Sequence, residues 1–169
     1  MNTLLGNAVS FTAACFTLAS SWSRDRRRIY LYQAAQCFLI AGANIFFASL
    51  SGVTTCLLCA LRNLLLACDR LTAKRCYLLV LLVTVIGAAA NNRGLLGLLP
   101  VAATAVYSVV CLRAQKTKAI KLNIVFNLLL WAVYDFFVLD YVSCAVDSVS
   151  ALVALASLLP RERRAAAQK

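Results

Sequence analysis

The sequence predicts an all-α membrane protein with seven transmembrane helices, arranged as two parallel triple-helix repeats joined by a linker helix (3+1+3). Hydrophobic residues make up 63% of the 169 residues and charged residues only 14%, and the mean hydropathy is +0.83. A soluble domain of this size could not bury so many Leu, Val and Ala side chains. The second observation is that the apolar residues form long stretches, and the third is that positive charge follows every second stretch.

Charged residues divide the chain into seven apolar stretches, each close to the length of a membrane-spanning helix. The third and fourth have only about 15 residues, against the roughly 20 that a spanning helix needs, so their ends are the hardest to place. Helices are expected because backbone groups cannot stay unpaired in lipid, and a barrel would alternate in polarity. The stretches are 4–20, 29–48, 53–68, 76–90, 95–112, 119–139 and 141–158.

Positive charge predicts the orientation, because Lys and Arg are retained on the cytoplasmic side of a membrane. The loops after the first, third, fifth and seventh stretches are basic, whereas the other loops hold only Arg93 and Asp140 as charged residues. We therefore expect the N-terminus outside and the C-terminus in the cytoplasm. The net charge of +11 favours contact with anionic lipid rather than nucleic acid, because the charges lie in loops that border the membrane. The basic residues of the loops are Arg24, Arg26, Arg27, Arg28, Arg70, Lys74, Arg75, Arg113, Lys116 and Lys118, and those of the tail are Arg161, Arg163, Arg164 and Lys169.

An internal repeat appears when the chain is shifted by 91 residues, which lays the first three stretches on the last three. Leu4, Leu5 and Gly6 then fall on Leu95, Leu96 and Gly97, and the basic loops and outer turns coincide as well. Two units of three spans keep the same orientation only if one extra helix joins them, and stretch 76–90 supplies it. The predicted units are the first repeat at 1–70, the linker at 71–94, the second repeat at 95–160 and a basic cytoplasmic tail at 161–169.

The second and sixth stretches each carry a polar face. Gln33, Gln36 and Asn44 fall within about 80° of arc on a helix. The sixth stretch carries five polar or aromatic residues that fall within about 120° of arc. The repeat lays Gln36 on Asn127 and Asn44 on Asp135. Such faces fit either a solute path shared by the two repeats or interhelical hydrogen bonds that hold the bundle together. The five residues are Asn123, Asn127, Trp131, Tyr134 and Asp135.

Three further residues stand out inside the predicted spans. Asp147 requires a partner, a solvated cavity or a bound proton at its depth in the seventh stretch. Arg62 in the third stretch is the cation that the repeat brings nearest, unless its long side chain reaches the cytoplasmic surface instead. Pro100 in the fifth stretch predicts either a hinge or a proline tolerated in the first helical turn.

The cysteines do not predict a metal site. The chain has eight Cys and no His, and most of the cysteines lie inside apolar stretches, where Cys acts as a small hydrophobe. Cys56 and Cys59 form a lone CxxC without a second pair, so we expect no metal and no other cofactor.

Three motifs resemble a known family. The run Asn-Leu-Leu-Leu-Trp-Ala-Val-Tyr-Asp at 127–135, the Gly-Leu-Leu-Pro run ending at Pro100 and Leu61-Arg62-Asn63 resemble the YgjV family of bacterial inner-membrane proteins over the whole chain. The resemblance implies a multi-pass protein of the bacterial inner membrane.

The 3+1+3 layout is similar, more distantly, to the SWEET sugar facilitators and the PQ-loop transporters, which implies alternating access between two triple-helix bundles. The Pro-Gln pair typical of PQ-loop proteins is replaced by Val9-Ser10 and Pro100-Val101, so this likeness does not imply sugar as the solute.

Two functions follow as hypotheses. The first is a small-solute facilitator or transporter whose path is lined by Gln36, Asn44, Asn127, Trp131, Tyr134 and Asp135. The alternative is a non-transporting membrane protein that binds a protein partner or anionic lipid through its basic loops and tail. An enzyme is not expected, because the sequence lacks His and shows no Ser and Lys pair or paired acids suited to general acid or base chemistry.

Overall fold

The computed structural model describes residues 2–22, 25–113 and 117–156. Within these ranges the chain forms seven α-helices, one 3-10 helix and no strand, which confirms the all-α class. The predicted tail at 161–169 and the loop residues Arg24 and Lys116 lie outside the described residues. The elements are α1 (Thr3–Trp22), α2 (Arg26–Phe46), α3 (Leu50–Ala67), α4 (Ala73–Ala89), the 3-10 helix η1 (Leu96–Leu98), α5 (Leu99–Arg113), α6 (Thr117–Val138) and α7 (Tyr141–Ala156).

The helices have the apolar character of membrane spans. Among the described residues, three helical stretches are both long and apolar enough to cross a membrane, and they are Thr3–Ser20, Arg27–Phe46 and Leu50–Ala67. Three shorter apolar stretches follow at Leu96–Val110, Leu122–Val138 and Tyr141–Leu155. Large apolar side chains such as Phe11, Phe126 and Leu152 are exposed, as expected of a surface that faces lipid.

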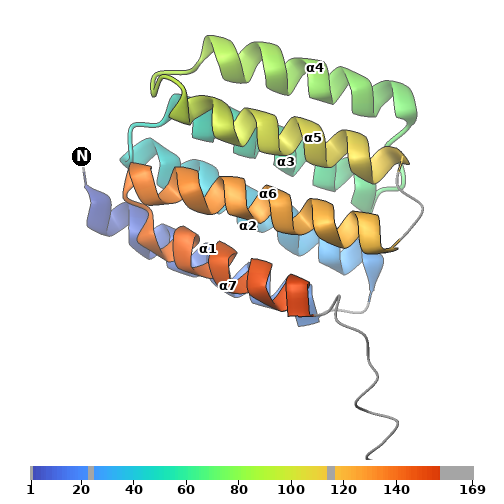
Figure 1. Ribbon diagram of the computed structural model, residues 1–169, viewed down its shortest axis with the longest axis horizontal. Coiled ribbons are helices and arrows are strands. Elements are labelled where there is room, and N and C mark those ends of the chain that lie inside the picture. Colours follow the sequence, from blue (N-terminus) through green and yellow to red (C-terminus); the bar gives the residue numbers. More distant parts are fainter. Residues whose placement is uncertain (1, 23–24, 114–116, 157–169) are drawn as a thin grey trace, which may run out of the picture.

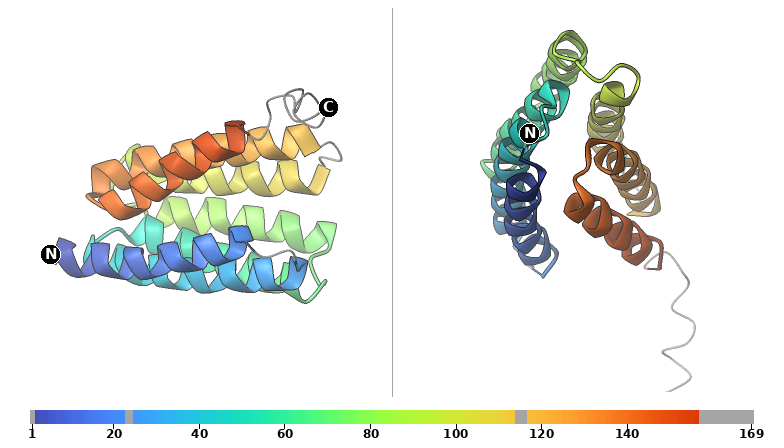
Figure 2. Two further views of the ribbon diagram at one scale, coloured as in Figure 1. Left: turned by 90° about the horizontal axis from the view of Figure 1, so that it is seen from below. Right: turned by 90° about the vertical axis from the view of Figure 1, so that its left-hand side faces the viewer.

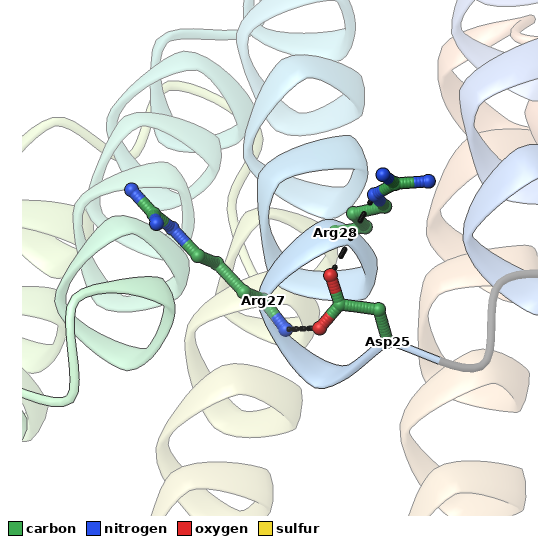
Figure 3. Close-up of polar contacts among 3 residues, drawn as sticks. All are labelled: Asp25, Arg27 and Arg28. Atoms are coloured by element: carbon green, nitrogen blue, oxygen red, sulfur yellow. Dashed lines mark hydrogen bonds and ion pairs between the residues drawn. The ribbon is translucent and has the colours of Figure 1, made fainter.

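Polar capping residues explain why three helices begin earlier than the apolar stretches predict. Helices α2, α3 and α4 each start three residues before the corresponding stretch. Side-chain oxygens of Asp25, Ser49 and Thr72 accept hydrogen bonds from backbone N–H groups of the first turn of each helix. Asp25 also lies 3.6 Å from Arg28 in an exposed ion pair (Figure 3). Caps satisfy N–H groups that a helix cannot satisfy itself, so the helix extends to them.

The helices lie side by side along one axis (Figure 1) and form two rows (Figure 2, right). In the first row α2 packs between α1 and α3, and in the second row α6 packs between α5 and α7. Helix α4 contacts α3 and α5 at one edge, and α1 contacts α7 at the other. The middle helices α2 and α6 make no close backbone contact in the described part of the chain, which leaves room between the rows.

The two ends of the bundle differ in their loops. The α1–α2, α3–α4 and α5–α6 connections lie at one end, here called the basic end, which carries Arg27, Arg28, Lys74 and Arg75 (Figure 1). The α2–α3, α4–α5 and α6–α7 connections lie at the opposite end. In Figure 2, left, α7 runs obliquely to α1 and is nearest to it towards the opposite end.

Candidate functional site

A cavity of ≈ 540 Å³ lies between the two rows. Residues of α1, α2 and α3 line one side, and residues of α5, α6 and α7 line the other. The lining runs from Ser143, near the start of α7, to Ser20 and Ala154 at the basic end. This volume is within the range of about 300–1,000 Å³ that small-molecule sites occupy. The cavity lining therefore extends from near the opposite end of the bundle to the basic end.

Most of the predicted polar residues lie in the cavity wall. Four of the six residues predicted for a solute path line it, together with both predicted intramembrane charges, Arg62 and Asp147. Asn44 and Tyr134 do not line it but lie buried beside it, towards the opposite end. The four path residues in the wall are Gln36, Asn127, Trp131 and Asp135.

Arg62 is held across the cavity wall against α5. Its guanidinium donates to Ser108 Oγ at 3.2 Å and to Asn63 Oδ1 at 3.3 Å. The guanidinium carbon also lies 5.0 Å from the centroid of the Tyr107 ring, the arrangement of a cation–π contact. The positive charge therefore stays inside the bundle, fixed to α3 and α5.

Two carboxyl groups of the second row have no protein partner in the described part of the chain. Asp135 is only 2% exposed, and Asp147 is half-buried. Neither carboxyl group makes a hydrogen bond or ion pair with a described residue, and both line the cavity. A lone carboxylate inside a membrane protein is costly unless water, a proton or a bound cation compensates it. The cavity is the place from which such compensation can come.

Side chains from both rows meet beside the cavity, towards the opposite end. The Tyr134 hydroxyl of α6 donates to Asn44 Oδ1 of α2 at 3.2 Å and also hydrogen-bonds with Ser49 Oγ at the start of α3. Tyr134 is fully buried and packs against Phe47 and Val138, and the Trp131 ring meets it edge-on, with the centroids 5.8 Å apart. We call the hydrogen-bonded side chains of Asn44, Ser49 and Tyr134 the tyrosine latch.

A glycine makes the tyrosine latch fit. A Cβ atom added at Gly52 would lie 2.6 Å from the Tyr134 hydroxyl and would also overlap the side-chain oxygen of Asn44. Such contacts are too short for any side chain, so Gly52 allows α3 to approach α2 and α6 this closely.

A second polar cluster joins the rows at the opposite end around Asp140. The carboxylate of Asp140 accepts from Ser10 Oγ of α1 at 2.6 Å and from Ser143 Oγ at 2.8 Å. It also accepts from the Ser143 backbone N–H at 3.1 Å, as a helix cap does. Nearby, Asn7 Nδ2 donates to the Leu139 carbonyl at 3.0 Å. Burial raises the pKa of Asp140 above its ordinary value, although the bonds from Ser10 and Ser143 act in the other direction.

Sequence reasoning missed the roles of Ser49 and Asp140, because each lies in a short turn between apolar stretches. A signal was present in the repeat, since the 91-residue shift lays Ser49 on Asp140. Both residues are also of the types that cap helices.

Three predicted residues remain, namely Pro100 and the two cysteines of the CxxC motif. Pro100 is the second residue of α5, directly after η1, where a missing N–H removes no intrahelical bond. Cys56 and Cys59 line the cavity as free thiols. Within the described ranges no three metal-ligating side chains converge.

Comparison with known proteins identifies one family. A family model described as Imp-YgjV, bacterial inner membrane protein, matches residues 4–164. No curated protein and no solved structure matches the chain.

Proposed function

Since this chain belongs to the Imp-YgjV family of bacterial inner membrane proteins, we propose that it moves a small polar solute across that membrane by alternating access. The observation that carries the proposal is the cavity between the rows, whose wall holds amides, an aromatic ring and two carboxyls that have no hydrogen-bond or ion-pair partner among the described residues. A structural core of this size would instead be filled by apolar side chains. Polar groups that face a cavity within a membrane commonly mark a solute path.

The proposed transport unit is a duplicated 3+1+3 bundle in which α1–α3 and α5–α7 are the repeats and α4 is the linker. In support, most cavity-lining residues form pairs that are 91 residues apart, one from each row. A cavity on the axis between two repeats is where many transporters bind their substrates. The pairs are Gln33 with Ile124, Gln36 with Asn127, Cys37 with Leu128, Ile40 with Trp131, Cys56 with Asp147, Cys59 with Ser150, Arg62 with Val153 and Asn63 with Ala154.

The proposed orientation places the basic end in the cytoplasm and the N-terminus outside, because basic loops are retained on the cytoplasmic side. The cavity then faces inward, and the tyrosine latch closes its outer side. In the proposed cycle, the two rows rock about their contacts at α4 so that the latch separates while the basic end closes. Gln36 and Asn127 exchange hydrogen bonds with the solute in both states, since an amide both donates and accepts.

Ligand-dependent stability tests this proposal. The purified protein would be heated in detergent with each member of a library of sugars, amino acids, polyamines and organic acids. A solute at about 100 times its dissociation constant adds about 2.7 kcal/mol to the native state. We expect at least one compound to stabilise the wild type and the Thr84→Ala control, whose side chain is exposed on α4, but not Asn127→Ala.

Flux of the stabilising compound into proteoliposomes completes the test. We expect wild type to carry it and Asp135→Asn, inserted at the same level, to lose transport. If no compound binds or crosses, the proposal fails. The partner or lipid hypothesis would then be favoured, with the added expectation that truncation of the tail at 161–169 abolishes cellular function.

A further inference from the structure

We propose that the solute is a small monovalent organic cation, with an ammonium group attached to a compact apolar body. This inference rests on the proposed transport function and names the substrate class of the same cavity. It is carried by two carboxyl groups of the cavity wall, those of Asp135 and Asp147, and by the aromatic and apolar side chains that line the same wall.

The Asp135 carboxyl is the strongest single indication of a bound cation. Asp135 lines the cavity although it is only 2% exposed. It makes no hydrogen bond or ion pair with a described residue. A buried carboxylate without a partner is costly, and a cation that binds beside it reduces this cost. Asp135 is therefore placed to bind a positively charged group that enters the cavity.

Asp147 adds a second carboxyl on the same side of the cavity. Helices α6 and α7 pack against each other and are joined by the short turn between Val138 and Tyr141. Asp135 lies three residues before the end of α6 and Asp147 six residues after the start of α7, so their backbone positions differ in depth by about 4.5 Å. Asp147 also has no partner among the described residues. One ammonium group, with its several N–H donors, can therefore interact with both carboxyls.

Charge balance favours a monovalent cation over other solutes. The described residues of the wall include one cationic side chain, Arg62, and two acidic side chains, so the wall has an excess of one negative charge when all three are ionised. This excess does not depend on which groups Arg62 contacts. A monovalent cation neutralises it, whereas an anion or a multivalent cation leaves a net charge inside the membrane. A zwitterion or a neutral sugar leaves the excess unchanged.

The rest of the wall suits an organic body. Trp131 lines the cavity one helical turn before Asp135 on α6, and the face of an indole ring attracts ammonium groups. Ile40, Ile124 and Leu128 add apolar surface to the wall. A hard metal ion instead needs many oxygen ligands, and within the described ranges no three acidic, Cys or His side chains converge. The wall therefore fits a cation that carries carbon groups.

Matched probes test the charge of the solute. The full-length wild-type protein in detergent at neutral pH is heated with roughly millimolar butylammonium or benzylammonium, a range typical of weak substrates. Butanol and benzyl alcohol are the neutral counterparts, butyrate and benzoate are the anionic counterparts, and aminobutyrate is a zwitterion. We expect at least one of the two cations to raise the unfolding temperature, and its counterparts to bind at least roughly tenfold more weakly.

Three aspartate variants place the cation. Asp135→Asn and Asp147→Asn each remove one negative charge from the wall, and each should weaken binding of the cation at least roughly tenfold. Asp25→Asn is the matched control, because it removes the same charge from the exposed cap of α2 and should leave binding unchanged. Each shift is measured against the variant's own unfolding temperature without probe, so that a change in stability is not counted as lost binding.

Arg62→Gln should act in the opposite direction. It removes the positive charge of the wall, so the cation should bind more tightly than to wild type. Weaker binding by a folded Arg62→Gln protein would contradict the argument from charge balance. If this variant does not fold, the three aspartate variants carry the test.

The failures are distinguishable. Stabilisation by a neutral, anionic, zwitterionic or multivalent compound, with neither cation active, overturns the cation and leaves the proposed transport function in place, with a proton balancing the wall. Equal binding of a cation to wild type, Asp135→Asn and Asp147→Asn overturns the site. A cation that binds at these carboxyls but does not cross the membrane of proteoliposomes supports the site and overturns transport. Absence of stabilisation and of flux for every compound overturns both proposals together.

Discussion

The α2–α3 turn and the α6–α7 turn are 91 residues apart and follow the same backbone course with different chemistry. Ala48 and Leu139 both have positive φ, 51° and 70°, although neither is glycine. Ser49 and Asp140 follow them, and each accepts a hydrogen bond from the backbone N–H three residues later. The serine cap is neutral, whereas the aspartate cap is acidic.

Each cap also reaches across to the other row. Ser49 hydrogen-bonds with Tyr134 of α6, and Asp140 accepts from Ser10 of α1. The same division continues into the cavity, where the first row supplies Arg62 and the second supplies Asp135. The comparison teaches that the two turns share a backbone course while the side chains that line the cavity from the two rows differ in charge.

The largest expected effect on stability follows from a substitution that disrupts the packing of the tyrosine latch beside the α2–α3 turn. Gly52→Ala inserts a methyl group against Tyr134 and Asn44, and overpacking together with lost hydrogen bonds should cost about 3 kcal/mol. Gly42→Ala is the matched control, because nothing lies within 4 Å of an added Cβ there, and it should be neutral or stabilising by up to about 1 kcal/mol. Unfolding temperatures in detergent check both. Equal effects would show that the latch is not tightly packed.

The next effect comes from removing one hydroxyl of the tyrosine latch. Tyr134→Phe leaves Asn44 and Ser49 buried without this partner and should cost about 2 kcal/mol. Tyr141→Phe is the control, because Tyr141 is exposed at the start of α7, and it should change stability by less than about 0.5 kcal/mol. The same unfolding assay decides, and a Tyr134→Phe variant as stable as wild type would contradict the account of the latch.

The acidic turn should be more sensitive than the exposed cap of α2. Asp140→Ala removes a cap and leaves the Ser10 hydroxyl buried without its partner, so a loss of about 1–2 kcal/mol is expected. Asp25→Ala removes a solvent-exposed cap at the basic end, and its loss should be near the lower limit for caps, about 0.5 kcal/mol. Thermal unfolding of the two variants measures the difference, and the reverse order would count against the buried cluster.

The smallest effect is a pH dependence confined to Asp140. Because burial raises the pKa of Asp140 in the folded protein, its contribution to stability is complete below the unfolded pKa of about 3.9 and is lost as pH rises through the folded pKa. Asp140→Asn lacks this group and keeps a good cap. As the pH rises above about 4, the wild type should lose stability relative to the variant, with a slope of at most about 1.4 kcal/mol per pH unit. Parallel pH profiles would contradict this prediction.

Features that depend on hydrophobicity and on helical periodicity could be predicted from the sequence. Composition predicted the all-α membrane class, and helical spacing predicted that Gln36, Asn127 and Asp135 share inward faces, where all three line the cavity. It could not place helix starts closely, because the caps at Ser49 and Thr72 are single polar residues at the ends of apolar runs.

Two aspects of the site depend on packing between rows, which spacing within a helix does not encode. Asn44 and Tyr134 share faces with the path residues, yet they bond to each other beside the cavity. Arg62 packs on Tyr107 and Ser108 of α5, a contact that the 91-residue repeat did not predict.

The measurement that tests the central claim most directly is chemical accessibility of the cavity from the two ends. A membrane-impermeant maleimide would be applied to either side of membrane vesicles containing Asn127→Cys in a background without native cysteines. Lys74→Cys at the basic end and Asn92→Cys at the opposite end report which side is which, whatever the orientation. We expect Asn127→Cys to react from the same side as Lys74→Cys and to be protected from the side that labels Asn92→Cys. Absence of reaction from both sides would show that the polar groups form a packed core and that no inward-facing cavity exists.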